Sequence, residues 1–122
     1  MKNILVADDK ATSRELIRIA LEGDDYAITE ASDGIEAVRC ARELGPDLII
    51  LDLHMPGLDG FGVLAELRRD GHFAATPIMA LTASAMQGDR ERALSAGFDS
   101  YVSKPLPLPA LRAEVKRLLG IG

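Results

Sequence analysis

Leu48-Ile49-Ile50-Leu51-Asp52 is the stretch of sequence that decides the fold. Four large apolar residues in a row are too few for a helix and include β-branched side chains. They predict a strand that is buried on both faces, as in the centre of a parallel sheet. Asp52 ends this strand, and a buried lone carboxylate is costly unless the site needs a negative charge. The chain therefore delivers a carboxylate to the C-terminal edge of a sheet, where open α/β folds bind ligands.

Strand and helix patterns alternate on both sides of this segment. Further apolar runs predict strands at residues 4–7, 27–31, 78–81 and 101–103, and apolar residues at helical spacing predict helices between and after them. Five such alternations predict an α/β fold, a doubly wound five-stranded parallel sheet with helices on both faces. We expect the flavodoxin-like strand order 2-1-3-4-5 and a single domain over residues 1–122.

Several local expectations depend on residue spacing alone. Thr12 and Glu15 have the spacing of a capping box and predict the start of the first helix. Leu16 and Ile35 occupy helical positions that we expect to face the sheet.

The helix predicted at residues 89–96 has few apolar side chains. Only Ala93 and Leu94 form an apolar pair there, so we expect both to pack inward. With so little apolar surface, this helix should be the most loosely held of the five.

Composition and charge exclude several classes of protein. The net charge of −5 argues against a direct nucleic-acid partner, because phosphate backbones require a basic surface. Cys40 is the single cysteine, so no disulfide framework or cysteine metal cage is expected, and its helical position predicts a small buried apolar residue. No apolar run approaches the roughly 20 residues of a membrane span, and no signal segment precedes the first strand. We expect a soluble cytoplasmic protein.

Polar side chains follow four of the predicted strands at the point where each strand ends. Asp8 and Asp9 follow the first, Asp52 the third, Thr82 ends the fourth and Lys104 follows the fifth. Neighbouring strands lie about 4.8 Å apart, so three carboxylates would meet at one edge and would need a cation to stay ionised. Oxygen ligands favour a hard ion such as Mg²⁺. A carboxylate nucleophile beside Mg²⁺, a hydroxyl and a lysine is suited to phosphoryl transfer.

These motifs, in this order and spacing, resemble those of a two-component response regulator receiver domain along the whole chain. The resemblance rests on Asp8-Asp9, Asp52 followed by Met55-Pro56 and Asp59-Gly60, Leu81-Thr82-Ala83, and Lys104-Pro105.

The resemblance implies roles for the acidic residues. Asp52 would be the phosphoryl acceptor, Asp9 a direct Mg²⁺ ligand and Asp8 a ligand mainly through water. The main-chain carbonyl of His54 would be the third protein oxygen on the metal, with the imidazole facing solvent.

The resemblance also implies roles for the other strand-end residues. Thr82 and Lys104 would bind the phosphoryl oxygens, with a cis peptide between Lys104 and Pro105. Tyr101 occupies the family's aromatic switch position. Taken singly, Thr82 could equally cap the next helix, and Tyr101 could be a half-buried aromatic residue of an edge strand.

The function implied is a switch rather than an enzyme for separate substrates. Asp52 would take a phosphoryl group from a histidine kinase or histidine phosphotransfer protein, and the chain would catalyse only its own phosphorylation and dephosphorylation. The face built from the fourth helix, fifth strand and fifth helix would then change its contacts with a target protein. His54 and Ser84 would border the path of the hydrolytic water, and we expect the His54 ring to slow hydrolysis.

The alternative is a phosphatase or phosphotransferase that uses Asp52 as nucleophile on a small substrate. Such enzymes commonly place a second acid two residues after the nucleophile, where this chain has His54.

Overall fold

The computed structural model describes residues 1–83, 88–105 and 107–121. Within these ranges the elements are β1 (Lys2–Ala7), α1 (Ala11–Ala20), β2 (Tyr26–Ala31), α2 (Gly34–Leu44), β3 (Leu48–Leu51), α3 (Gly60–Arg68), the 3-10 turn η1 (Gly71–Phe73), β4 (Ile78–Thr82), α4 (Asp89–Ala96), β5 (Ser100–Ser103) and α5 (Leu108–Leu119).

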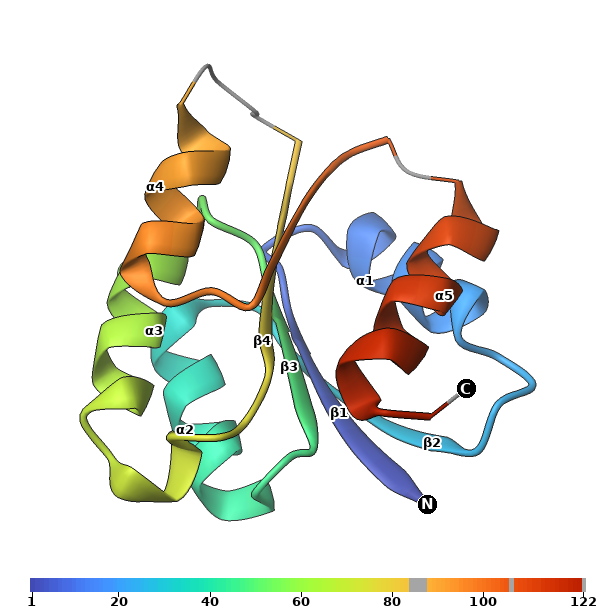
Figure 1. Ribbon diagram of the computed structural model, residues 1–122, viewed down its shortest axis with the longest axis horizontal. Helices are drawn as coiled ribbons and strands as arrows, with labels where there is room; N and C mark the ends of the chain where they lie inside the picture. Colours follow the sequence, from blue (N-terminus) through green and yellow to red (C-terminus); the bar gives the residue numbers. More distant parts are fainter. Residues whose placement is uncertain (84–87, 106, 122) are drawn as a thin grey trace.

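Over the described ranges the strands form one parallel sheet of five, in the order β2-β1-β3-β4-β5. Helices α1 and α5 cover one face of the sheet, and α2, α3 and α4 cover the other (Figure 1). The predicted fold class and strand order are therefore confirmed. The register pairs Ala7 with Leu51, and Leu51 with Ala80, so the strands reach their C-terminal ends at one edge.

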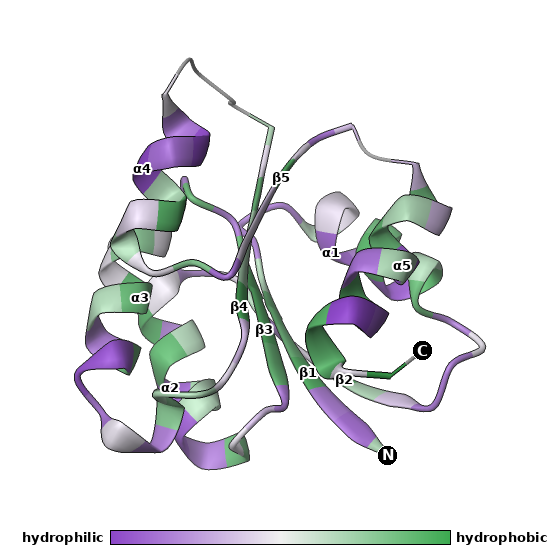
Figure 2. Ribbon diagram, in the orientation of Figure 1, coloured by the Kyte–Doolittle hydropathy of each residue, from purple (hydrophilic) through white to green (hydrophobic). Residues whose placement is uncertain are grey.

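The sheet separates two apolar cores. Side chains of β3 alternate between them, with Ile49 and Leu51 in the core beneath α2 and α3, and Leu48 and Ile50 in the core beneath α1 and α5. All four are at most 1% exposed, as predicted for a central strand. Cys40 lies buried in the first of these cores, also as predicted. Figure 2 shows the hydrophobic residues concentrated along the central strands.

Helix α1 begins earlier than the sequence predicts. Its N-cap residue is Lys10, without a side-chain capping bond, so the predicted capping box of Thr12 and Glu15 is wrong. The reason is the tight turn that follows β1. The Lys10 amide donates to Asp8 Oδ1 at 2.9 Å, and the Ser13 amide donates to the Lys10 carbonyl at 3.1 Å. Helix α1 has therefore begun at Ala11, before Thr12.

Three apolar side chains expected to face the sheet are exposed instead. Leu16 is 55% exposed, Ile35 68% and Leu94 41%, so these expectations are wrong. Each neighbours the residue that does face inward, because successive helical residues point about 100° apart. Gly34 shows this best, since a Cβ there would lie 1.8 Å from the Leu58 carbonyl oxygen. This close approach directs the following residue, Ile35, outward.

Helices α4 and α5 are held very differently. Helix α4 buries Ala93 alone among its residues, which agrees with the expectation of a loosely held helix, and Figure 2 shows its first turns to be hydrophilic. Helix α5 buries Leu111 and Val115, and its Glu114 accepts a hydrogen bond from the Ser100 hydroxyl of β5. None of the helices within the described residues is long and apolar enough to cross a lipid bilayer.

Candidate functional site

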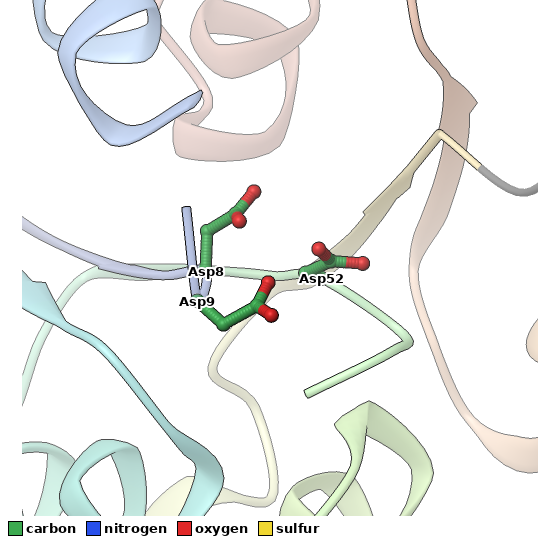
Figure 3. A group of neighbouring side chains, drawn as sticks. All are labelled: Asp8, Asp9 and Asp52. Carbon is green, nitrogen blue, oxygen red and sulfur yellow. The ribbon is translucent and has the colours of Figure 1, made fainter. Parts of the chain in front are cut away.

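Three carboxylates meet where β1 and β3 end. Ligand oxygens of Asp8, Asp9 and Asp52 all lie within 4.8 Å of one another, and the side chains gather around one space (Figure 3). Adjacent strands bring them together, because the Asp52 amide donates to the Ala7 carbonyl at 2.9 Å. Asp8 is 1% exposed and Asp52 6%, whereas Asp9 is exposed to solvent. The predicted convergence of these three residues is therefore present in the structure.

Lys104 brings a positive charge to this cluster from the end of β5. Its Nζ lies 2.7 Å from Asp8 Oδ2 and 3.9 Å from Asp52 Oδ2, and it donates to the Ser13 hydroxyl at 3.2 Å. The peptide bond that joins it to Pro105 is cis, as predicted. One ammonium group faces three carboxylates, so the cluster keeps an excess of negative charge.

Burial and neighbouring charge disfavour the ionised form of Asp52. Burial raises the pKa of this carboxyl group above its usual 3.8, and the charges of Asp8 and Asp9 raise it further. The His54 amide, which donates to Asp52 Oδ1 at 3.1 Å, and the Lys104 ammonium act in the opposite direction. Burial is the largest of these effects, so the net result is a raised pKa. A cation bound beside Asp52 would oppose it and favour the ionised carboxylate that a nucleophile must present.

Thr82 and Tyr101 lie on the two strands that follow β3 in the sheet, β4 and β5. Thr82 ends β4 and is fully buried, and its carbonyl accepts a 2.7 Å hydrogen bond from the Lys104 amide. Tyr101 is half-buried on β5, the edge strand beyond β4. Its hydroxyl is buried, with no hydrogen-bond partner among the described residues. The structure thus places Lys104 in direct contact with the acidic cluster and links Thr82 to Lys104 through the main chain.

The loop after β3 positions His54 and packs against Asp52. The His54 side chain is exposed, as expected, while its amide holds the Asp52 carboxylate. Helix α3 begins close behind, because a Cβ on Gly60 would lie 2.6 Å from the Asp52 carbonyl oxygen. A side chain at this position would push α3 away from Asp52. Ser84 lies outside the described residues.

Two residues of α1 belong to this site and were missed from the sequence. The Ser13 hydroxyl accepts from Lys104, and the Arg14 guanidinium donates to the Asp8 carbonyl at 2.7 Å. Neither residue forms part of a pattern, since a serine and an arginine in the first turns of a helix are ordinary surface residues. Their role depends on the direction in which α1 leaves β1, which the sequence motifs do not specify.

The sequence model of the response regulator receiver domain matches residues 4–116 of this chain. The polar-differentiation response regulator DivK of Brucella anthropi is 34% identical over 119 residues, which span 98% of this chain and 97% of DivK. The transcriptional regulatory protein ResD of Bacillus subtilis is 44% identical over 116 residues, which span 95% of this chain and 47% of ResD. The similarity thus covers nearly all of DivK but only about half of ResD.

Solved structures share the fold along almost the whole chain. The receiver domain of the sensor histidine kinase PA1611 from Pseudomonas aeruginosa has a TM-score of 0.89 and 37% identity, and the match covers 98% of both chains. That structure has a magnesium ion coordinated in its active-site cleft. The chemotaxis protein CheY4 of Vibrio cholerae also has a TM-score of 0.89, with 27% identity over 97% of this chain and 98% of its own.

Proposed function

The chain belongs to the response regulator receiver domain family of two-component signalling, and from this we propose that Asp52 is its phosphoryl acceptor. The donor would be a histidine kinase or a histidine phosphotransfer protein. The observation that carries the proposal is the position of Asp52. It is a buried carboxylate at the end of the central strand, held by the His54 amide and lying 3.9 Å from the Lys104 ammonium.

The residues at this edge of the sheet fit a magnesium ion. Asp8, Asp9 and Asp52 supply only oxygen ligands, the donor type that hard divalent cations prefer, and they carry more negative charge than Lys104 balances. The main-chain carbonyl of His54 would complete the protein ligands. When bound, Mg²⁺ would neutralise charge on the transferring phosphoryl group.

The remaining steps belong to residues of the chain itself. An Asp52 carboxylate oxygen attacks the phosphorus atom and forms the acyl phosphate, while the bond to the donor breaks and the donor keeps its electron pair. Lys104 leaves Asp8 for a phosphoryl oxygen, and the Thr82 hydroxyl binds another. The domain thereby catalyses only its own phosphorylation and, with water as the attacking group, its own dephosphorylation.

The output would be a change in protein contacts at the face formed by α4, β5 and α5. Helix α4 buries a single residue, which suits a face that rearranges, and Arg90 links this helix to β5 by donating to the Tyr101 carbonyl at 3.4 Å. Tyr101 would move with Thr82 as the switch. We propose that the domain, residues 1–122, works in the cytoplasm and binds its target through this face.

The similarities support this function over a phosphatase or transferase that acts on small substrates. DivK is named a response regulator and the PA1611 structure a receiver domain, and His54 occupies the position of the second acid that such enzymes use. Steady turnover of p-nitrophenyl phosphate by the purified protein would favour the enzyme instead.

The direct test is phosphorylation with acetyl phosphate and Mg²⁺, followed by mass spectrometry of the intact protein. We expect one acid-stable, base-labile phosphoryl group on the wild type and none on Asp52→Asn, because an amide is not a nucleophile here. Asp59→Asn is the matched control. Asp59 is an exposed residue that caps α3 by accepting from the Gly62 amide, and asparagine also caps helices. Undiminished labelling of Asp52→Asn would refute the proposal.

A further inference from the structure

We propose that Arg14 is a positioning residue for the acidic cluster, because its guanidinium group fixes the peptide plane that joins Asp8 to Asp9. The inference rests on the proposed function, since it concerns how well these carboxylates bind Mg²⁺.

Arg14 connects the two acids with the edge strand. Its Nη1 donates to the Asp8 carbonyl oxygen at 2.7 Å, and its Nε donates to Glu30 Oε1 of β2 at 2.9 Å. The Arg14 side chain is only 18% exposed, so both hydrogen bonds are partly shielded from water. A planar guanidinium with donors on adjacent nitrogens suits two acceptors in fixed directions.

These contacts determine the orientation of the turn that carries both carboxylates. The Asp8 amide is already held by the Ala31 carbonyl at 3.1 Å, so Arg14 secures the other side of the same residue. The Asp8 carbonyl and the Asp9 amide belong to one rigid peptide plane. By holding that carbonyl, Arg14 sets the direction in which the Asp9 side chain leaves the main chain. Asp9 is exposed, so it depends on this plane more than on packing.

Glu30 provides a firm anchor for Arg14. It also accepts hydrogen bonds from Arg18 Nη2 at 2.8 Å and Arg18 Nε at 3.1 Å. The Arg18 hydrogen bond, together with that of Arg14, lowers the pKa of the Glu30 carboxyl group below its usual 4.5 although burial opposes this. Glu30 is therefore ionised at neutral pH and restrains the guanidinium at Nε, while Nη1 remains directed at the Asp8 carbonyl.

Arg14 could instead serve only to attach α1 to β2, and Mg²⁺ affinity separates the two roles. Melting temperature is measured against Mg²⁺ concentration, and the increase yields an apparent dissociation constant. If Arg14 only attaches α1 to β2, its removal should lower the melting temperature without Mg²⁺ but leave the dissociation constant for Mg²⁺ unchanged. If Arg14 positions the acids, its removal should raise that dissociation constant.

Four proteins suffice: the wild type, Arg14→Ala, Arg14→Lys and the control Arg18→Ala. Arg18 lies on the same helix and also donates to Glu30, but it does not contact the Asp8 carbonyl. The control variant therefore removes an arginine without removing the contact under test. We expect Arg14→Ala and Arg14→Lys to raise the dissociation constant for Mg²⁺ about tenfold, because residues that orient ligands typically contribute this much. Arg18→Ala should stay within about twofold of the wild type.

Each other outcome overturns the inference. Wild-type affinity in Arg14→Ala would leave Arg14 a purely structural residue, and wild-type affinity in Arg14→Lys would show that charge matters rather than geometry. If Arg14→Ala does not fold, Arg14→Lys makes the same comparison against the wild type and Arg18→Ala. A wild type that does not respond to Mg²⁺ would refute the proposed metal site as well, whereas unchanged affinity in the variants alone refutes only the role of Arg14.

Discussion

The buried position of Asp52 makes its carboxyl group difficult to ionise. Burial raises its pKa above 3.8, so the folded protein loses stability as the pH rises through the titration of this group. The residue suited to accept a phosphoryl group is therefore one that destabilises the unmodified, metal-free domain at neutral pH.

Asp52→Asn should accordingly stabilise the metal-free protein at neutral pH, because it removes a carboxylate whose ionised form burial disfavours. The gain should vanish below pH 3.8, where Asp52 is protonated in both the folded and the unfolded state. Urea unfolding at several pH values in the presence of EDTA measures the difference. An Asp52→Asn protein that is less stable than the wild type at neutral pH would mean that the contacts with Lys104 and His54 outweigh burial.

At the scale of single residues, the sequence predicted where the three acids meet but not the contributions of Ser13 and Arg14 to the site. The convergence of Asp8, Asp9 and Asp52 follows from strand order, because parallel strands end at one edge. The contacts of Ser13 and Arg14 depend instead on how a helix is oriented against a main-chain carbonyl, and such contacts leave no motif.

Among the elements, α4 is linked to α3 through an aromatic ring. Arg92 lies 4.2 Å from the centre of the Phe61 ring, and Phe61 meets Phe98 edge to face at 5.7 Å. Phe61 lies in the first turn of α3, next to Gly60, which packs on Asp52. These contacts link α4 to the backbone beside the proposed acceptor.

Arg92→Ala should loosen α4 in preference to the rest of the fold. We expect a loss of about 0.5–1 kcal/mol from the cation–π contact, seen as faster amide hydrogen exchange in residues 92–96. Phe61→Leu keeps an apolar side chain without the aromatic face, and the double variant completes a thermodynamic cycle. Additive effects of the two substitutions would show that the contact contributes nothing.

The ends of a helix could be predicted where residues of that helix determine them. The errors arose where contacts with another segment of the chain determine where a helix begins or which side chain is exposed. Asp33 caps the start of α2 with its side chain, and Gly45 ends the helix in the left-handed conformation, as these residue types commonly do. The start of α1 and the exposure of Ile35 depended on the Asp8 turn and the Leu58 carbonyl, which lie outside those helices.

For the whole molecule, repulsion among the three carboxylates lowers the stability of the fold, and a bound cation should relieve it. Millimolar Mg²⁺ should raise the melting temperature of the wild type, because binding to the folded state alone adds about 2.7 kcal/mol at one hundred times the dissociation constant. Asp9→Ala should abolish most of this increase. Asp8→Ala should reduce it less, because Asp8 is already paired with Lys104 at 2.7 Å.

Sodium chloride at matched ionic strength is the control, since screening alone also weakens repulsion between carboxylates. A melting temperature that responds equally to both salts would contradict a specific site, and a larger loss in Asp8→Ala than in Asp9→Ala would reverse the assigned roles.

The ion pair between Lys104 and Asp8 joins residues that are 96 positions apart in the chain. At a synthesis rate of about 5–20 residues per second, Asp8 is added to the chain about 5–20 seconds before Lys104. A nascent chain that has not yet reached Lys104 therefore carries the acids without their ammonium partner. Assembly of the site thus waits for the fifth strand, and its carboxylates gain their ammonium partner only after that strand has been translated.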